Sequence, residues 1–149
     1  MATGNLAQHV ADGLFAMEKH RADEREYRFS VPGQKLFIEL ASEDGREKFY
    51  LDLYRGKRNV FKVSLQNRAR QTFSLRRLDV NGRKHTNPNG QVVPTPHLHV
   101  YREGFGTSWA EPAPLDIFSN LNDVWTTLQD FMRYCNISKP PIIRRDLFT

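Results

Sequence analysis

Between residues 36 and 65, apolar side chains occupy every second position in three successive runs. The apolar members of these runs are Leu36, Ile38 and Leu40, then Phe49, Leu51 and Leu53, then Phe61, Val63 and Leu65. Successive side chains of a β-strand point to opposite faces, so each run predicts a strand with one buried and one polar face. The connections between the runs are short, which favours an antiparallel sheet.

Two further strands are predicted downstream. The fourth covers residues 73–80, although its apolar residues change phase between Leu75 and Leu78. One extra residue near Arg76-Arg77 restores the facing, which is the geometry of a β-bulge. The fifth strand is predicted over residues 97–102, where apolar residues again alternate with polar ones.

An amphipathic helix is predicted at each end of the chain. The N-terminal helix has one apolar face, formed by Leu6, Val10, Leu14 and Met17. The C-terminal helix has a longer apolar stripe, formed by Leu121, Val124, Trp125, Leu128, Phe131 and Met132. These spacings are those of one helix face. Ser119 or Asn120 is the expected N-cap of the second helix, and Asn136 its expected stop.

The order helix, about five strands, helix predicts an α+β domain with two layers. The two helices have apolar faces that must be buried, so both are expected to cover one face of the antiparallel sheet. A chain of 149 residues is the size of one domain, and residues 1–149 are therefore interpreted as a single domain. Pro140 and Pro141 cannot continue a helix, so residues 138–149 are expected to form an extended C-terminal tail.

Several classes of protein are excluded by composition. No apolar run approaches the ~20 residues of a membrane span, so no contact with a membrane is expected. The N-terminal residues show neither the basic region nor the apolar region of a secretory signal, which predicts a cytoplasmic protein. The single cysteine, Cys135, excludes an internal disulfide and a cysteine-based zinc cage. The oligomeric state is left open.

Basic residues are concentrated between Arg55 and His85. The ten are Arg55, Lys57, Arg58, Lys62, Arg68, Arg70, Arg76, Arg77, Arg83 and Lys84. Asp79 is the only acidic residue in this segment, which carries +9, whereas the rest of the chain carries −4. This concentration favours a polyanionic partner, since each neutralised phosphate releases counterions. The expected partner is nucleic acid, RNA before DNA, or else an acidic protein surface.

The uncovered face of the predicted sheet combines aromatic rings with cations. The side chains expected on it include Tyr50, Tyr54, Lys62, Arg76, His97, His99 and Tyr101. The nucleic-acid-binding candidates are Lys62, Arg68, Arg70, Arg76, Arg77, Arg102, Tyr50 and Tyr54. Such a face suits single-stranded nucleic acid, because rings stack on bases and cations hold phosphates. An ordinary solvated sheet face is the alternative, because Tyr and Lys are also common in strands.

Three of the five histidines lie within fifteen positions. His97 and His99 are two apart in a predicted strand, so their rings share a face at a backbone separation of about 7 Å. A turn at residues 87–90 could bring His85 towards them. Histidine titrates near neutral pH, so this cluster could act as acid and base in metal-free cleavage of RNA. The candidate catalytic residues are His85, His97, His99, Arg76 and Tyr101.

Two other roles for the histidines stay open. The spacing His97-x-His99-x-x-x-Glu103 is that of the first cupin metal motif, and His85 could complete such a set. The second cupin motif is absent after Glu103. Histidines beside turns also often bind loop carbonyls and serve only a structural purpose. The favoured interpretation uses no metal and no cofactor.

Half of the chain resembles a family of small bacterial and phage-borne proteins. The resemblance rests on residues 75–82 (LRRLDVNG), 85–90 (HTNPNG), 97–104 (HLHVYREG), the pair Trp109-Ala110 and residues 134–137 (YCNI). It brings no assigned activity and no catalytic residues. It implies a setting in mobile elements or defence, such as a toxin–antitoxin pair or a phage counter-defence protein.

Two classes of function are therefore expected. The first is a small RNA-acting enzyme, a metal-independent ribonuclease of toxin type that uses the histidines. The second is a non-catalytic phage or plasmid inhibitor, resembling an anti-CRISPR protein or an antitoxin, which binds a nucleic-acid-handling host complex. Both use the basic face, and they differ in the role of the histidines.

Overall fold

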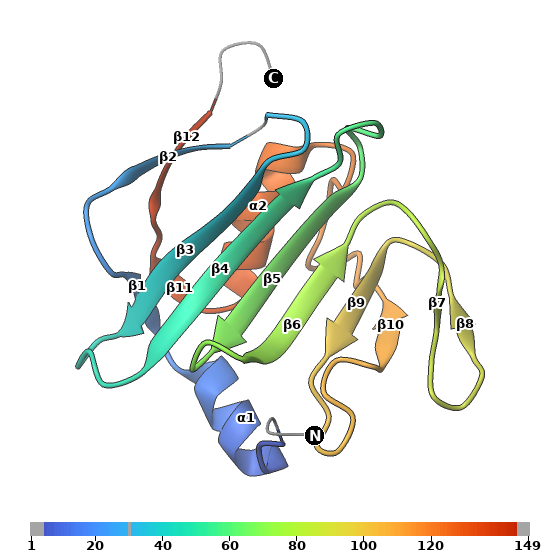
Figure 1. Cartoon of the computed structure of the whole chain (residues 1–149), viewed down its shortest axis with the longest axis horizontal. Coiled ribbons are helices and arrows are strands. Elements are labelled where there is room, and N and C mark those ends of the chain that lie inside the picture. Colours follow the sequence, from blue (N-terminus) through green and yellow to red (C-terminus); the bar gives the residue numbers. More distant parts are fainter. Residues whose placement is uncertain (1–4, 30, 146–149) are drawn as a thin grey trace.

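The computed structural model describes residues 5–29 and 31–145 and contains two helices and a large twisted sheet (Figure 1). The helices are α1 (Gln8–Ala16) and α2 (Val124–Tyr134). The large sheet has the strand order β10-β9-β6-β5-β4-β3-β1-β11. Its strands are β1 (Lys19–Arg21), β3 (Lys35–Ser42), β4 (Lys48–Arg55), β5 (Val63–Ala69), β6 (Phe73–Asp79), β9 (His97–Val100), β10 (Ala110–Pro112) and β11 (Ile137–Lys139).

Two small two-stranded sheets complete the fold. In one, β2 (Glu26–Phe29) pairs in parallel with β12 (Ile142–Arg145). In the other, β7 (His85–Thr86) and β8 (Val92–Val93) form an antiparallel hairpin. The large sheet is antiparallel except for the β1–β11 pair. The predicted α+β class is confirmed, but about five strands was too low a number, because the large sheet alone has eight in the described residues.

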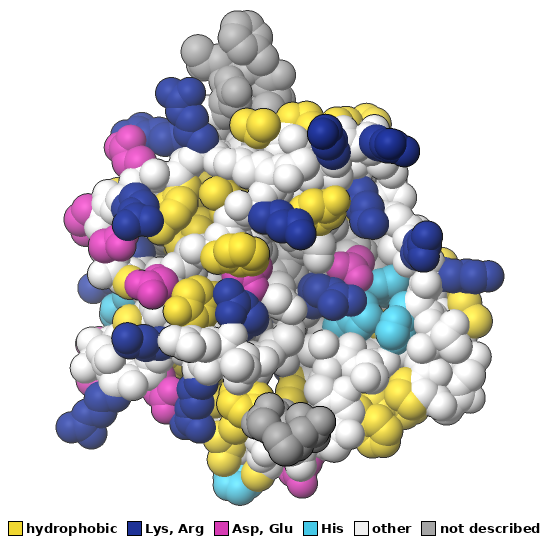
Figure 2. Space-filling model, viewed as in Figure 1, with side chains coloured by type: hydrophobic (Ala, Val, Ile, Leu, Met, Phe, Trp, Pro, Cys, Tyr) yellow, Lys and Arg dark blue, Asp and Glu magenta, His cyan; other side chains and the backbone are white. Residues whose placement is uncertain are grey.

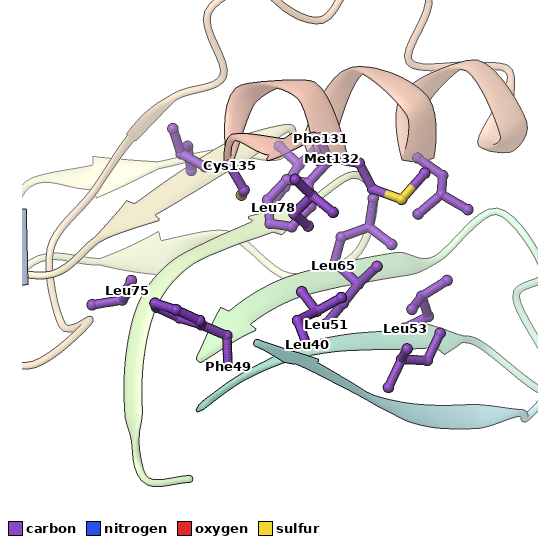
Figure 3. Close-up of a cluster of buried hydrophobic side chains, with 14 of the residues drawn as sticks. Leu40, Phe49, Leu51, Leu53, Leu65, Leu75, Leu78, Phe131, Met132 and Cys135 are labelled. Carbon is purple, nitrogen blue, oxygen red and sulfur yellow. The ribbon is translucent and has the colours of Figure 1, made fainter. Parts of the chain in front are cut away.

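The core lies between the sheet and α2. Figure 3 shows leucines of the central strands, including Leu51 and Leu65, pointing towards Phe131 and Met132 of the helix. Leu51, Leu65 and Phe131 are fully buried. Burying each such side chain contributes roughly 1.5–3 kcal/mol, so this contact fixes which face of the sheet is covered. No helix of the described residues lies on the opposite face, which is towards the viewer in Figure 1.

The first helix does not lie beside the second. α1 lies across the ends of the central strands, at the bottom of Figure 1, rather than over the face of the sheet. It contacts α2 through Phe15, whose ring centroid is 5.3 Å from that of Tyr134. The expectation that both helices cover one face was thus correct for α2 and wrong for α1.

The ends of α2 differ partly from the sequence prediction. Asp123, not Ser119 or Asn120, is the N-cap, and its side chain accepts a hydrogen bond from the Thr126 backbone N–H. The prediction for the other end is confirmed, since the helix ends at Tyr134 and Asn136 has a positive φ of 58°. Asn tolerates this left-handed conformation better than most residues.

The predicted β-bulge is present in β6. Asn67 of β5 pairs with Arg76, and the next residue of β5 pairs with Ser74, so Leu75 has no partner. The extra residue puts both Leu75 and Arg76 on the helix-covered side. Leu75 is fully buried there, and Arg76 contacts Tyr134 of α2.

Part of the predicted C-terminal tail forms β-strands in the structure. Residues 137–139 form β11 and residues 142–145 form β12, and each pairs with a segment near the N-terminus. Residues 146–149 lie outside the described part of the chain. Neither of the helices in the described residues is long and apolar enough to cross a membrane.

Candidate functional site

The uncovered sheet face carries aromatic, basic and histidine side chains. Figure 2 looks onto this face and shows Lys and Arg around hydrophobic side chains in its middle, with histidines beside them. We call it the open face and define it by the outward residues of β3–β6 and β9. Those that matter below are Lys35, Phe37, Tyr50, Asp52, Tyr54, Ser64, Gln66, Arg68, Arg77, Asp79, His97 and His99.

Two adjacent strands assemble a cluster of histidine, aspartate and arginine. In the β6–β9 register, Asp79 lies opposite His97 and Arg77 lies opposite His99. The Asp79 Oδ2 atom is 3.1 Å from His97 Nε2 and 3.2 Å from His99 Nε2. Arg77 Nη2 is 3.0 Å from His99 Nε2 and 3.3 Å from Asp79 Oδ2. Four side chains from two strands therefore converge on one point.

The other nitrogen of each ring is held by the backbone. His97 Nδ1 donates to the Val93 carbonyl at 3.1 Å, and His99 Nδ1 donates to the Thr107 carbonyl at 2.8 Å. A carbonyl can only accept, so both Nδ1 atoms carry hydrogen. In the neutral form of each ring, Nε2 then carries no hydrogen, and its lone pair is directed at Asp79.

The cluster is covered by the β7–β8 hairpin rather than by a helix. His97 and His99 are only 2% and 1% exposed. The His85 ring lies over them, with centroid distances of 4.6 Å to His99 and 5.9 Å to His97. His85 Nε2 donates to the Ser108 carbonyl at 2.7 Å. The three histidines are brought together as predicted, but the expected accessibility of His97 and His99 was wrong.

Asp79 is held in its charged form. Burial alone raises the pKa of this carboxyl group, but the contact with His99, the positive charge of Arg77 and the hydrogen bond from Ser64 together lower it by more. The net result is a pKa well below the usual range. Ser64 Oγ donates to Asp79 Oδ1 at 2.8 Å, which leaves Oδ2 directed at the histidines.

A second ion pair lies in the middle of the open face. Arg68 donates to both oxygens of Asp52, from Nε at 2.5 Å and from Nη2 at 2.9 Å. Its guanidinium group also lies over the ring of Tyr50, 4.4 Å from the centroid. The bidentate contact with Asp52 raises the pKa of Arg68 above its ordinary value. The carboxylate of Asp52 also balances the positive charge of Arg68.

Two predicted catalytic residues lie away from the open face. Arg76 points to the covered side, where Nε donates to the Tyr134 hydroxyl at 3.0 Å and the guanidinium stacks on the Phe15 ring. Tyr101 is 3% exposed, and its hydroxyl accepts from the Leu6 backbone N–H and donates to the Leu6 carbonyl. The placement of both on the open face was wrong, because the bulge turns Arg76 inward and β9 ends before Tyr101.

The other predicted binding residues divide into two groups. Lys62, Arg68, Arg77, Tyr50 and Tyr54 lie on or at the rim of the open face. Arg70 lies past the end of β5 and pairs with Glu47 at 2.7 Å, and Arg102 stacks on Trp109 beyond β9. Glu103 of the cupin-like spacing accepts a hydrogen bond from the Gln8 backbone N–H, so the carboxylate beside the histidines is that of Asp79.

Sequence reasoning missed Asp79 and Phe37 as site residues. The spacing of Arg77 and Asp79 matches that of His97 and His99 in a neighbouring strand, which is a usable signal once the bulge is placed. Phe37 breaks the apolar-in, polar-out pattern of β3 and is 64% exposed. An exposed phenylalanine in the polar phase of a strand is the corresponding signal for that residue.

Residues 6–137 match the family of unknown function DUF6978. The chain belongs to this family. The match includes the whole sheet face just described and the segments 75–110 and 130–137 on which the motif resemblance rests. Membership of DUF6978 therefore agrees with the expectation of an uncharacterised family. Searches of curated proteins and of solved structures find no match.

Proposed function

We propose that this DUF6978 protein binds single-stranded nucleic acid on the open face of its sheet. The observation that carries the proposal is the exposed ring of Phe37 beside a basic hollow. An exposed ring on the polar side of a strand gives a surface on which a base can stack, and neighbouring cations can contact phosphates. The open face contains both.

The hollow runs across four strands. Its first half is lined by Lys35, Phe37, Tyr54 and Arg77, among others, and its second half by Tyr54, Arg77, Lys62 and Arg83. The halves share Tyr54, Ser64 and Arg77, so they adjoin and together extend from β3 to the connection after β6. We call it the β3–β6 track. Lys35 Nζ lies 5.6 Å from the centroid of the Tyr54 ring, which places a cation next to a ring within the track.

The charge balance of the β3–β6 track favours an anion. Its two carboxylates, Asp52 and Asp79, are each in contact with an arginine. Lys35, Lys62 and Arg83 are exposed and have no ion-pair partner within the described residues. Three such cations beside balanced ion pairs leave a net positive surface for phosphates.

The test is fluorescence anisotropy with a labelled oligouridylate of about 12 nucleotides, a length within the range of one small binding domain. The logarithm of the affinity should fall linearly with the logarithm of the salt concentration as the salt rises from about 50 to about 200 mM. Phe37→Ala should weaken binding about tenfold or more by removing a stacked ring. Lys62→Ala/Arg83→Ala should weaken binding and make the salt dependence shallower.

The matched control is Phe105→Ala, which removes another exposed phenylalanine that lies outside the β3–β6 track. It should leave the affinity unchanged. Oligodeoxyuridylate of the same length measures the preference for RNA. If the wild-type protein does not bind either strand at about 50 mM salt, or if Phe37→Ala binds like the control, an acidic protein surface becomes the better candidate partner.

The contacts of the histidines do not favour metal-free cleavage of a bound strand. Such chemistry needs a ring nitrogen that faces the substrate. In His97 and His99, Nδ1 is bonded to the backbone and Nε2 faces Asp79. The proposal is therefore one of binding. A setting in mobile elements or defence remains what the motif resemblance implies.

A further inference from the structure

The Asp79, His97 and His99 cluster has the atoms and spacing of a metal site. The ligand atoms Asp79 Oδ2, His97 Nε2 and His99 Nε2 all lie within 4.8 Å of one another. The two oxygen–nitrogen distances are 3.1 and 3.2 Å. Ligand atoms that lie about 2.0–2.1 Å from one ion at angles of 90–109° are about 2.9–3.4 Å apart. Both measured distances fall in this interval.

The surroundings of the three residues hold them in the orientation that a metal requires. Each histidine that binds a metal generally donates its other ring N–H to a carbonyl or carboxylate, which fixes the tautomer. His97 and His99 do so to the carbonyls of Val93 and Thr107. The second oxygen of Asp79 accepts from Ser64 in the same way. All three ligands thus have a supporting hydrogen bond.

The cluster needs a cation for electrostatic reasons. With both rings neutral, two lone pairs face one carboxylate oxygen, which is repulsive unless positive charge lies between them. Arg77 supplies part of that charge, because Nη2 contacts both His99 Nε2 and Asp79 Oδ2. Among the described residues, His97 Nε2 has only the Asp79 carboxylate as a hydrogen-bond partner. The lone pair of His97 Nε2 is therefore available to a metal ion.

We propose that Asp79, His97 and His99 bind a divalent transition-metal ion. Two imidazoles and one carboxylate suit ions such as Zn²⁺, Co²⁺ or Fe²⁺, whereas Mg²⁺ and Ca²⁺ prefer all-oxygen sites. Three protein ligands leave at least one coordination position open. The proposal does not depend on the binding of nucleic acid.

The open position faces the β3–β6 track. Asp79 and Arg77 line the second half of that hollow, whereas the β7–β8 hairpin with His85 covers the other side. A small ligand of the metal therefore enters next to Arg77. The guanidinium group makes an anionic oxygen, such as that of a phosphate or carboxylate, the expected partner at this position.

The test is titration of the chelator-treated full chain with Zn²⁺ by calorimetry and with Co²⁺ by visible absorption. One equivalent of either ion should bind, and Co²⁺ should give absorption bands of a site with nitrogen and oxygen ligands. Asp79→Asn and His99→Gln should each weaken Zn²⁺ binding by about 100-fold or more, since supporting hydrogen bonds alone are worth 10- to 100-fold. Mg²⁺ should not compete.

The matched control is His9→Ala, which removes an exposed histidine of α1 that lies outside the cluster. It should bind Zn²⁺ like the wild-type protein. His99→Gln replaces a buried side chain, so circular dichroism checks its fold, and Asp79→Asn provides a second variant at a more exposed position. Wild-type protein without a stoichiometric Co²⁺ spectrum, or equal affinity in Asp79→Asn and His9→Ala, would overturn the proposal in favour of a hydrogen-bonded structural cluster.

Discussion

Asn87 holds the β7–β8 hairpin against the large sheet through both ends of its side-chain amide. Nδ2 donates to the Ala110 carbonyl at 3.0 Å, and Oδ1 accepts from the Ala110 N–H at 2.8 Å. The side chain is 4% exposed. Because His85 belongs to the same hairpin, Asn87 helps to keep the cover of the histidine cluster in place.

Asn87→Ala should lower the free energy of unfolding by about 2–3 kcal/mol, because it leaves both backbone groups of Ala110 without these partners. Urea unfolding at neutral pH measures the change. Asn89→Ala is the control, since Asn89 is exposed and accepts only one local bond, from Gln91. Similar losses in the two variants would show that Asn87 does not hold the hairpin.

Individual residues also show where sequence reasoning stops. Alternation correctly assigned Tyr50 and Tyr54 to the open face, because regular strands fix their facing. Arg76 was misplaced, since a bulge can be inferred from a phase change but its position can be wrong by one residue. The burial of His97 was not predictable from alternation, because it depends on a hairpin that is distant from the strand's own pattern.

At the scale of elements, Lys19 joins the C-terminal ends of the two helices. Its Nζ atom donates to the carbonyls of Phe15 and Met17, at 2.8 and 3.0 Å, and to the Cys135 carbonyl at 2.7 Å. The residue is fully buried, and its ammonium group also lies over the ring of Phe49, 5.0 Å from the centroid. A buried lysine with three carbonyl acceptors fixes α1 relative to α2.

Lys19→Met should destabilise the protein by about 3 kcal/mol, because three carbonyls lose a charged donor. The comparison is with Lys48→Met, in which an exposed lysine of β4 is replaced. Thermal and urea unfolding should agree on the difference. Equal stability of the two variants would mean that packing alone positions α1.

The same lysine predicts a dependence on pH. Burial lowers the pKa of Lys19 from 10.5 to about 8 in the folded protein. Between about pH 8 and pH 10.5, Lys19 is therefore protonated in the unfolded chain but not in the folded protein. The free energy of unfolding increases as the pH rises through this range. Relative to Lys19→Met, the wild-type protein should gain up to about 3 kcal/mol between pH 7 and pH 10.5. A constant or shrinking difference would contradict the lowered pKa.

The long strands were predictable, whereas the short ones, apart from β9, were not. Strands β3 and β5 bury alternate residues, and β4 does so apart from the buried Asp52, so their pattern is visible locally. Strands β2 and β12 are four residues long, and they pair in parallel although they are far apart in sequence. Their stability comes from pairing with a distant segment, which no local period reveals. Strands β1 and β11 are also short and pair with each other across most of the chain. They form an edge of the large sheet that the sequence did not predict.

The whole molecule places two candidate sites on one face of one sheet. The ring of Phe37 belongs to β3, whereas the histidine cluster belongs to β6 and β9, with β4 and β5 between them. The β3–β6 track connects them through Arg77, which lines both of its halves. The proposed metal and a bound strand can therefore be neighbours while they use different side chains.

This separation predicts opposite effects of two substitutions, measured on the same preparations. Phe37→Ala should weaken binding of oligouridylate about tenfold or more and leave Zn²⁺ affinity unchanged, because it removes a stacking ring but no ligand. Asp79→Asn should weaken Zn²⁺ binding about 100-fold or more. In metal-free buffer it should leave nucleic-acid affinity unchanged or raise it, because it removes a negative charge from the track. If a folded Asp79→Asn protein also loses nucleic-acid binding in metal-free buffer, Asp79 belongs to both sites and the proposed separation is wrong.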